Sequence, residues 1–188
     1  MKILVPLAKG FEEIEAVTIV DVLRRAEFEV TLAGLEAGPC LGSRGVLITP
    51  DVEWKEIEPS DFDALVLPGG MGGTLAMAER PELLAALQVF RSEERWVGAI
   101  CAAPLVLARA GVVDQVPITA HPGVQGELGK RCAAIEPGPR VLVSGHVVTS
   151  QGAGTAMEFA LELVGLWAGE AMRQSVAEGL VAANPRLR

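Results

Sequence analysis

The sequence predicts an α/β fold in which helices flank a mostly parallel sheet. Short apolar runs rich in Val, Ile and Leu alternate with helical stretches of about ten or more residues, which is the pattern of βαβ units. Hydrophobic residues make up 50% of the chain, and several runs are apolar throughout, as in strands buried on both faces. The 188 residues suit one domain, 1–188, because no linker, internal repeat or low-complexity tract interrupts them.

The first half of the chain is expected to supply three strands and one long helix. Residues 2–7, 29–35 and 64–68 are short apolar runs and are predicted strands. Residues 12–26 place Ile19, Val22 and Ala26 on one face at a 3.6-residue period, which indicates an amphipathic helix. Residues 36–60 contain repeated Gly and Pro and are expected to form a loop with a small hairpin.

The second half continues the alternation. Helices are predicted at residues 82–94, 102–110 and 155–167, and Pro104 suits the first turn of the second of these. Strands are predicted at residues 97–100, 117–119 and 147–150. Residues 121–146 are similarly broken by Gly and Pro.

Composition limits the classes of partner and compartment. The net charge of -8, from 24 acidic and 16 basic residues, argues against a nucleic-acid partner. No segment approaches the roughly 20 apolar residues of a membrane span. The apolar stretch at the N-terminus is too short for a secretory signal, which is not expected. Three cysteines are too few for a disulfide scaffold, so we expect a cytoplasmic protein with at least one free thiol. No His, Cys and Asp cluster has metal-ligand spacing, and neither a metal nor a cofactor is expected.

Three motifs follow predicted strands, at the sheet edge where ligands bind in such folds. They are Pro-Gly-Gly at residues 68–70, Cys-Ala-Ala-Pro at residues 101–104 and Thr-Ala-His-Pro at residues 119–122. We therefore expect the functional site at this edge.

Cys101 stands at a sharp turn from a strand into the helix that contains Pro104. The turn resembles the nucleophile elbows of hydrolases. The free N–H groups and the positive end of the helix are expected to lower the pKa of the thiol and to raise its thiolate fraction. The alternative is a buried structural cysteine, because Cys is among the most buried residue types.

The glycines at residues 69–73 would let the backbone approach a ligand, and their N–H groups, with the amide of Ala102, are candidates to bind an oxyanion. The alternative to a binding role is that these glycines only give flexibility to a strand-to-helix turn.

Glu15 lies on the apolar stripe of its predicted helix, where a carboxyl group has a raised pKa and can serve as a general acid or base. The alternative is a glutamate at the start of the helix that reaches back to solvent.

His121 is the candidate base, because it follows a strand expected beside the strand of Cys101, whereas His146 is expected in a surface turn. Cys40 lies in a loop and is expected to be exposed, and no role is assigned to Cys132.

Four segments together resemble the ThiJ/PfpI superfamily, which has the class I glutamine amidotransferase-like fold. They are Leu-Ala-Lys-Gly-Phe-Glu-Glu-Ile-Glu-Ala (7–16), Val-Leu-Pro-Gly-Gly (66–70), Ala-Ile-Cys-Ala-Ala-Pro (99–104) and Thr-Ser-Gln-Gly-Ala-Gly-Thr-Ala (149–156), in order over nearly the whole chain. Cys-Ala-Ala-Pro and Ser-Gln-Gly-Ala-Gly-Thr are similar to bacterial members of the branch that contains the parkinsonism-associated deglycase. The resemblance implies a flavodoxin-like three-layer sandwich with helices on both faces, and a homodimer.

The resemblance also implies residue roles. In the family a protonated glutamate, matching Glu15, contacts an easily oxidised elbow cysteine, matching Cys101. Amides matching Gly70 and Ala102 bind a developing oxyanion, and a histidine matching His121 lies nearby, although some bacterial members lack it.

Arg25 and Arg44 match two family arginines expected near the dimer interface. Cys40 is offset by two residues from a family loop cysteine and takes no role from it.

The function implied by the resemblance is cofactor-independent detoxification of α-oxoaldehydes, either by glyoxalase III-type conversion of methylglyoxal to lactate or by deglycation of proteins and nucleotides. Cys101 would add to the aldehyde, and Glu15, helped by His121, would move a proton. One alternative is an oxidative-stress sensor and redox-regulated chaperone acting through oxidation of Cys101. Another is a cysteine peptidase, although no acid partner for His121 stands out in the sequence.

Overall fold

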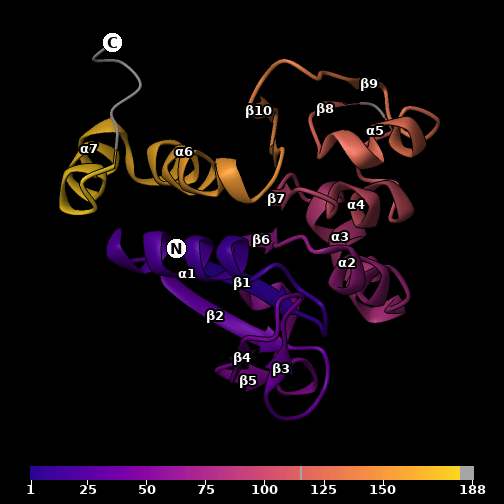
Figure 1. Ribbon diagram of the computed structural model, residues 1–188, viewed down its shortest axis with the longest axis horizontal. Coiled ribbons are helices and arrows are strands. Elements are labelled where there is room, and N and C mark those ends of the chain that lie inside the picture. Colours follow the sequence, from indigo (N-terminus) through magenta and orange to yellow (C-terminus); the bar gives the residue numbers. More distant parts are fainter. Residues whose placement is uncertain (115, 183–188) are drawn as a thin grey trace.

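The computed structural model describes residues 1–114 and 116–182, along which strands and helices alternate (Figure 1). In chain order the elements are β1 (Lys2–Leu7), α1 (Glu13–Arg25), β2 (Glu29–Gly34), β3 (Cys40–Leu41), β4 (Leu47–Ile48), β5 (Val52–Glu53), the 3-10 turns η1 (Trp54–Glu56) and η2 (Pro59–Asp61), β6 (Ala64–Leu67), α2 (Met71–Ala78), α3 (Pro81–Ser92), β7 (Trp96–Ile100), α4 (Pro104–Arg109), β8 (Pro117–Ile118), α5 (Pro122–Leu128), β9 (Ala134–Ile135), β10 (Val141–Ser144), β11 (Val147–Ser150), η3 (Ala153–Thr155), α6 (Ala156–Ala168) and α7 (Glu170–Gly179).

The main sheet has the strand order β10-β11-β7-β6-β1-β2-β5. Only β10 runs antiparallel to its neighbour, and the other pairings are parallel. Because β7, β6 and β1 are adjacent and parallel, their carboxyl ends meet at one edge. The segments that follow these three strands therefore converge there.

Helices cover both faces of the sheet, which confirms the predicted three-layer α/β architecture (Figure 1). Side chains alternate between two cores along each strand, as the pleat requires. Along β1, Ile3 and Val5 join the core beneath α1 and α6, whereas Leu4 joins the core beneath α2, α3 and α4. All three are fully buried.

The long predicted elements are confirmed to within a few residues, with two differences. The prediction that the strand before His121 lies beside the strand before Cys101 is wrong. The first of these strands, β8, pairs with β9 in a separate two-stranded sheet, and the second, β7, lies between β11 and β6. Three further helices, α2, α5 and α7, lie where none was predicted. No helix in the described ranges is both long and apolar enough to cross a membrane.

Candidate active site

Cys101 occupies a strained elbow directly after β7. Its φ of 64° lies in the left-handed region, which costs a residue with a Cβ on the order of 1–2 kcal/mol. Two backbone hydrogen bonds hold the turn: Cys101 N–H donates to Ser150 O at 3.0 Å, and Ala103 N–H donates to Ile100 O at 3.0 Å. Pro104 then begins α4. The predicted elbow is confirmed, and the strain at one half-buried cysteine is typical of a functional position.

Glu15 is fully buried on the sheet-facing side of α1, so its carboxyl group does not reach solvent. Its Oε2 accepts a hydrogen bond of 2.7 Å from the backbone N–H of Gly69. The other oxygen, Oε1, is buried without a conventional hydrogen bond, and the carboxyl group interacts with the thiol of Cys101. The structure therefore brings Glu15 and Cys101 together.

The pKa values of this pair are strongly perturbed. Burial raises the pKa of Glu15 to about 7, although the Gly69 N–H acts in the opposite direction. Burial, followed by the charge of the Glu15 carboxylate, raises the pKa of Cys101 to about 12. The lowered thiol pKa expected from the sequence is therefore wrong, chiefly because the sulfur is buried. Near neutral pH the thiol is therefore protonated, and the Glu15 carboxyl group changes between its protonated and ionised forms.

The amides of Gly70 and Ala102 both donate toward the Cys101 sulfur, where they favour the thiolate. Gly70 has a φ of 87°, and a Cβ there would lie 2.5 Å from Glu12 N and from Gly10 O. Only glycine suits this position, because both the dihedral angle and the close backbone exclude a side chain. Binding of an oxyanion by these amides stays a prediction.

His121 reaches the site without the strand pairing that was expected to place it. Its backbone N–H donates to Cys101 O at 2.9 Å. A Cβ added to Gly152 would lie 3.5 Å from Cδ2 of His121 and 4.0 Å from Sγ of Cys101. Both side chains therefore border the space that a side chain at Gly152 would fill.

A cavity of about 400 Å³ opens beside these groups. Its lining includes four residues that the sequence did not single out as site residues, from the start of α1, the β3–β4 turn, α2 and η3: Glu12, which caps α1, Ser43, Met71 and Ala153. Gly72, one of the predicted glycines, lines it as well. The predicted Glu15, Gly70, Cys101 and His121 also line it, together with Arg44.

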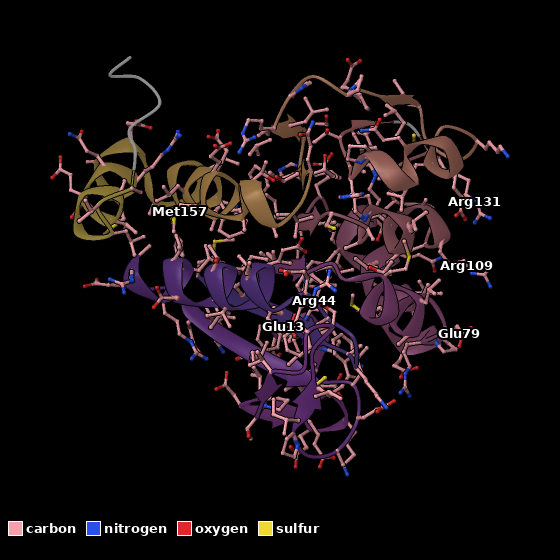
Figure 2. All side chains as sticks on the ribbon, in the orientation of Figure 1. Glu13, Arg44, Glu79, Arg109, Arg131 and Met157 are labelled. Carbon is pink, nitrogen blue, oxygen red and sulfur yellow. The ribbon has the colours of Figure 1, made fainter. Side chains whose placement is uncertain are left out.

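Glu13 holds the β3–β4 turn against the cavity. Its carboxyl group accepts hydrogen bonds from Ser43 Oγ and from the backbone N–H groups of Arg44 and Val46, and Figure 2 shows Glu13 beside Arg44. Burial alone would raise the pKa of Glu13, but these bonds lower it. A buried carboxylate thus positions Ser43 and Arg44, a tertiary contact that no local sequence pattern reveals.

The remaining candidates lie outside this cavity. Arg25 is exposed on α1, where its Nε pairs with Asp21 at 2.8 Å. Cys40 is half-buried, not exposed as expected, and burial raises its pKa to about 11. His146 lies in the turn between β10 and β11, against the ring of Trp96. Within residues 1–114 and 116–182, no group of three or more His, Cys, Asp or Glu side chains is arranged to hold a metal ion.

Comparison with known proteins establishes the family. The model of the DJ-1/PfpI family matches residues 1–166. The chain belongs to the DJ-1/PfpI family. It is 41% identical over 181 residues to Protein dj-1beta of Drosophila melanogaster, with 96% of each chain covered. It is 34% identical over 178 residues to a glutathione-independent glyoxalase, DJR-1.2, of Caenorhabditis elegans, covering 92% of this chain and 91% of that protein.

Solved structures of the family agree closely with the fold. The crystal structure of Drosophila melanogaster DJ-1beta superposes with a TM-score of 0.92 at 40% identity, over 97% of this chain and 98% of that one. The structure of oxidized Toxoplasma gondii DJ-1 gives a TM-score of 0.91 at 34% identity, over 97% and 99% of the two chains. The DJ-1/PfpI fold predicted from the sequence is thus confirmed.

Proposed function

We propose that this DJ-1/PfpI protein converts α-oxoaldehydes such as methylglyoxal and glyoxal to 2-hydroxy acids without a cofactor. The observation that carries the proposal is the buried Glu15 carboxyl group against the thiol of Cys101, beside a cavity that fits a small aldehyde. A nucleophile adjoining a carboxyl group with a pKa of about 7 is suited to both addition and proton transfer at neutral pH. The relative named as a glutathione-independent glyoxalase supports this class of substrate.

The chemistry begins with addition of Cys101 to the aldehyde. Sγ bonds to the aldehyde carbon, the thiol proton passes to the Glu15 carboxylate, and the carbonyl electron pair moves to oxygen. Return of that proton to the oxygen gives a hemithioacetal.

Glu15 then moves a proton between neighbouring carbons. Its carboxylate removes the proton from the former aldehyde carbon, and the enediol that forms is protonated at the former ketone carbon. The product is a lactate thioester on Cys101, which water hydrolyses to lactate and free thiol. The net reaction adds one water to methylglyoxal, and neither oxidant nor reductant is consumed.

Formation of lactate in the absence of glutathione tests the proposal. Cys101→Ser should abolish it, and Glu15→Gln should lower the rate by roughly 100-fold or more. Cys132→Ser is the matched control, because Cys132 is a half-buried thiol outside the cavity, and it should retain the wild-type rate. Equal rates from all four proteins would refute the role of the pair.

Deglycation of early adducts on proteins or nucleotides would use the same thiol. Slow release of free methylglyoxal from an adduct gives the same products, so the two activities separate only when an aldehyde trap is present. If no adduct is repaired while the trap is present, the glyoxalase activity is the only one of the two that remains supported.

A second candidate function is an oxidative-stress sensor and redox-regulated chaperone that acts through oxidation of Cys101. The sulfur is half-buried beside two amides, and a family structure is described as oxidized. A gain of two oxygen atoms on Cys101 after mild peroxide, seen by intact-mass spectrometry, is the expected sulfinic acid. No such species at Cys101 would remove this candidate.

A cysteine peptidase is supported least. In a Cys-His-acid set one ring nitrogen of the histidine donates a hydrogen bond to a carboxylate. Here Nδ1 of His121 instead accepts a hydrogen bond from the backbone N–H of Gly123.

We also propose a homodimer formed through α1 and the β3–β4 hairpin. Ile14 and Val17 on α1 and Leu47 on β4 are 58%, 51% and 64% exposed, which is unusual for large apolar side chains. A groove of about 270 Å³ between α1 and β4 continues this apolar surface. Arg25 on α1 and Arg44 in the hairpin turn lie on the same two elements. A second copy would cover the apolar side chains.

A cytoplasmic location completes the proposal. All three cysteines, Cys40, Cys101 and Cys132, are unpaired, which suits a reducing compartment.

A further inference from the structure

His121 caps the start of α5 with its own ring. Nδ1 accepts a hydrogen bond of 3.1 Å from the backbone N–H of Gly123. Pro122 at the first helical position has no N–H, so Gly123 offers the first free donor of the helix. The ring nitrogen that serves as this acceptor cannot also carry a proton.

The protonation pattern of the ring follows from this bond. A neutral imidazole has one donor and one acceptor nitrogen. Since Nδ1 is the acceptor, a neutral ring in this position carries its proton on Nε2. A proton added at Nδ1 would point at the Gly123 N–H and break the cap.

The backbone fixes the ring relative to Cys101. His121 N–H donates to Cys101 O at 2.9 Å, and Val124 N–H donates to His121 O at 3.0 Å. The Cδ2 edge of the ring, which adjoins Nε2, faces the space above Gly152 that Sγ of Cys101 also borders. Both residues line the same cavity of about 400 Å³.

We propose that His121 is a neutral hydrogen-bond donor in the reaction and not a general base. When Sγ adds to the aldehyde carbon and the carbonyl electron pair moves to oxygen, Nε2–H donates a hydrogen bond to that oxygen without transferring its proton. The proton that moves is the thiol proton, which passes to Glu15. This role rests on the proposed aldehyde chemistry, and it assigns all proton transfer between carbons to Glu15.

The tautomer can be measured without turnover. Long-range ¹H–¹⁵N correlation spectra of the wild-type protein should show His121 with a protonated Nε2 and a bare Nδ1 at the pH of the assay. His146→Gln identifies the signals, because the chain has only two histidines. A protonated Nδ1, alone or in an imidazolium, would overturn the proposal.

Two substitutions separate a donor from a base. In His121→Gln the side-chain amide can place an N–H near the position of Nε2, whereas in His121→Asn the shorter side chain can replace only the cap at Nδ1. Neither amide can act as a base. For a donor, His121→Asn should lose roughly 100-fold in kcat, and His121→Gln should recover a measurable part of that loss.

Equal large losses in both variants, with wild-type circular dichroism spectra, would contradict the donor role. If Gln at this position prevents folding, the tautomer measurement still decides the proposal. A wild-type protein that makes no lactate would refute the proposed function, and the spectra would then test the ring's protonation on their own.

Discussion

The backbone N–H of Gly69 donates a 2.7 Å hydrogen bond to Oε2 of Glu15, and so fixes the carboxyl group beside the elbow cysteine. A Cβ at Gly69 would lie 2.7 Å from both Oε2 of Glu15 and Cβ of Cys101. The position therefore supplies a hydrogen-bond donor while leaving room for the two reactive side chains to approach each other.

Gly69→Ala should force Glu15 and Cys101 apart. We expect kcat/KM for methylglyoxal to fall roughly 100-fold, because small displacements of reacting groups have effects of that size. The free energy of unfolding should fall by about 1–3 kcal/mol through overpacking. Urea denaturation and lactate assays measure both effects. Gly126→Ala, where a Cβ meets nothing within 4 Å, should leave kcat/KM unchanged and, because Gly126 lies within α5, should not lower the free energy of unfolding.

Gly152→Ala tests the space between Cys101 and His121. The new methyl group would make ordinary contacts of 3.5 Å and 4.0 Å with them, so the fold should keep its urea midpoint. It would occupy the space where substrate must lie, and kcat/KM should fall by roughly 10-fold or more. Gly154→Ala, two residues away and with no neighbour within 4 Å, is the control. An unchanged kcat/KM in Gly152→Ala would place the substrate elsewhere.

Burial of Glu15 makes stability depend on pH. Its folded-state pKa of about 7 is above the model-compound value of 4.5, so folding favours the protonated form. The resulting stability is fully present below pH 4.5 and is lost as the pH rises through about 7. The free energy of unfolding contributed by this shift in the Glu15 pKa amounts to roughly 3 kcal/mol.

Glu15→Gln should remove this dependence, because the amide does not titrate. Urea denaturation at several pH values between 5 and 8 measures the slope. Glu79→Gln changes an exposed glutamate (Figure 2) and should leave the wild-type slope intact. Parallel slopes in wild type and Glu15→Gln would mean that Glu15 stays ionised throughout.

Val17→Glu should disrupt the proposed dimer. The charge would enter the exposed apolar face of α1, and burying it against a second copy is costly. Sedimentation equilibrium should show a dimer for wild type and a monomer for the variant. Val89→Glu is the matched control, because Val89 is 42% exposed on α3, which covers the opposite face of the sheet. Dimers from both variants would reject this interface.

Periodicity and local turn rules predicted the positions of Glu15 and Cys101, whereas their pairing was implied only by the resemblance to the ThiJ/PfpI superfamily. The 3.6-residue stripe of α1 placed Glu15 with Ile19 and Val22, and all three are fully buried. The strand–Cys–Pro pattern predicted the elbow at Cys101. These features depend on near neighbours in the chain, which a sequence displays directly.

Features that depend on tertiary contacts were not predicted. Pairing of β8 with β9 is decided by packing over the end of the sheet, and the sequence does not encode it locally. The β3–β4 turn lines the cavity because buried Glu13 binds Ser43 and Arg44, some 30 residues away. The sign of the Cys101 pKa shift was wrong because burial and the Glu15 charge outweigh the amides.

The account depends most on coupling between Cys101 and Glu15. Its direct test is the thiolate absorbance of Cys101 against pH in wild type and in Glu15→Gln, each corrected by its own Cys101→Ser variant to remove Cys40 and Cys132. We predict that Glu15→Gln lowers the Cys101 pKa from about 12, because the neighbouring carboxylate charge is removed. Identical titrations in the two proteins would contradict a cysteine–glutamate pair.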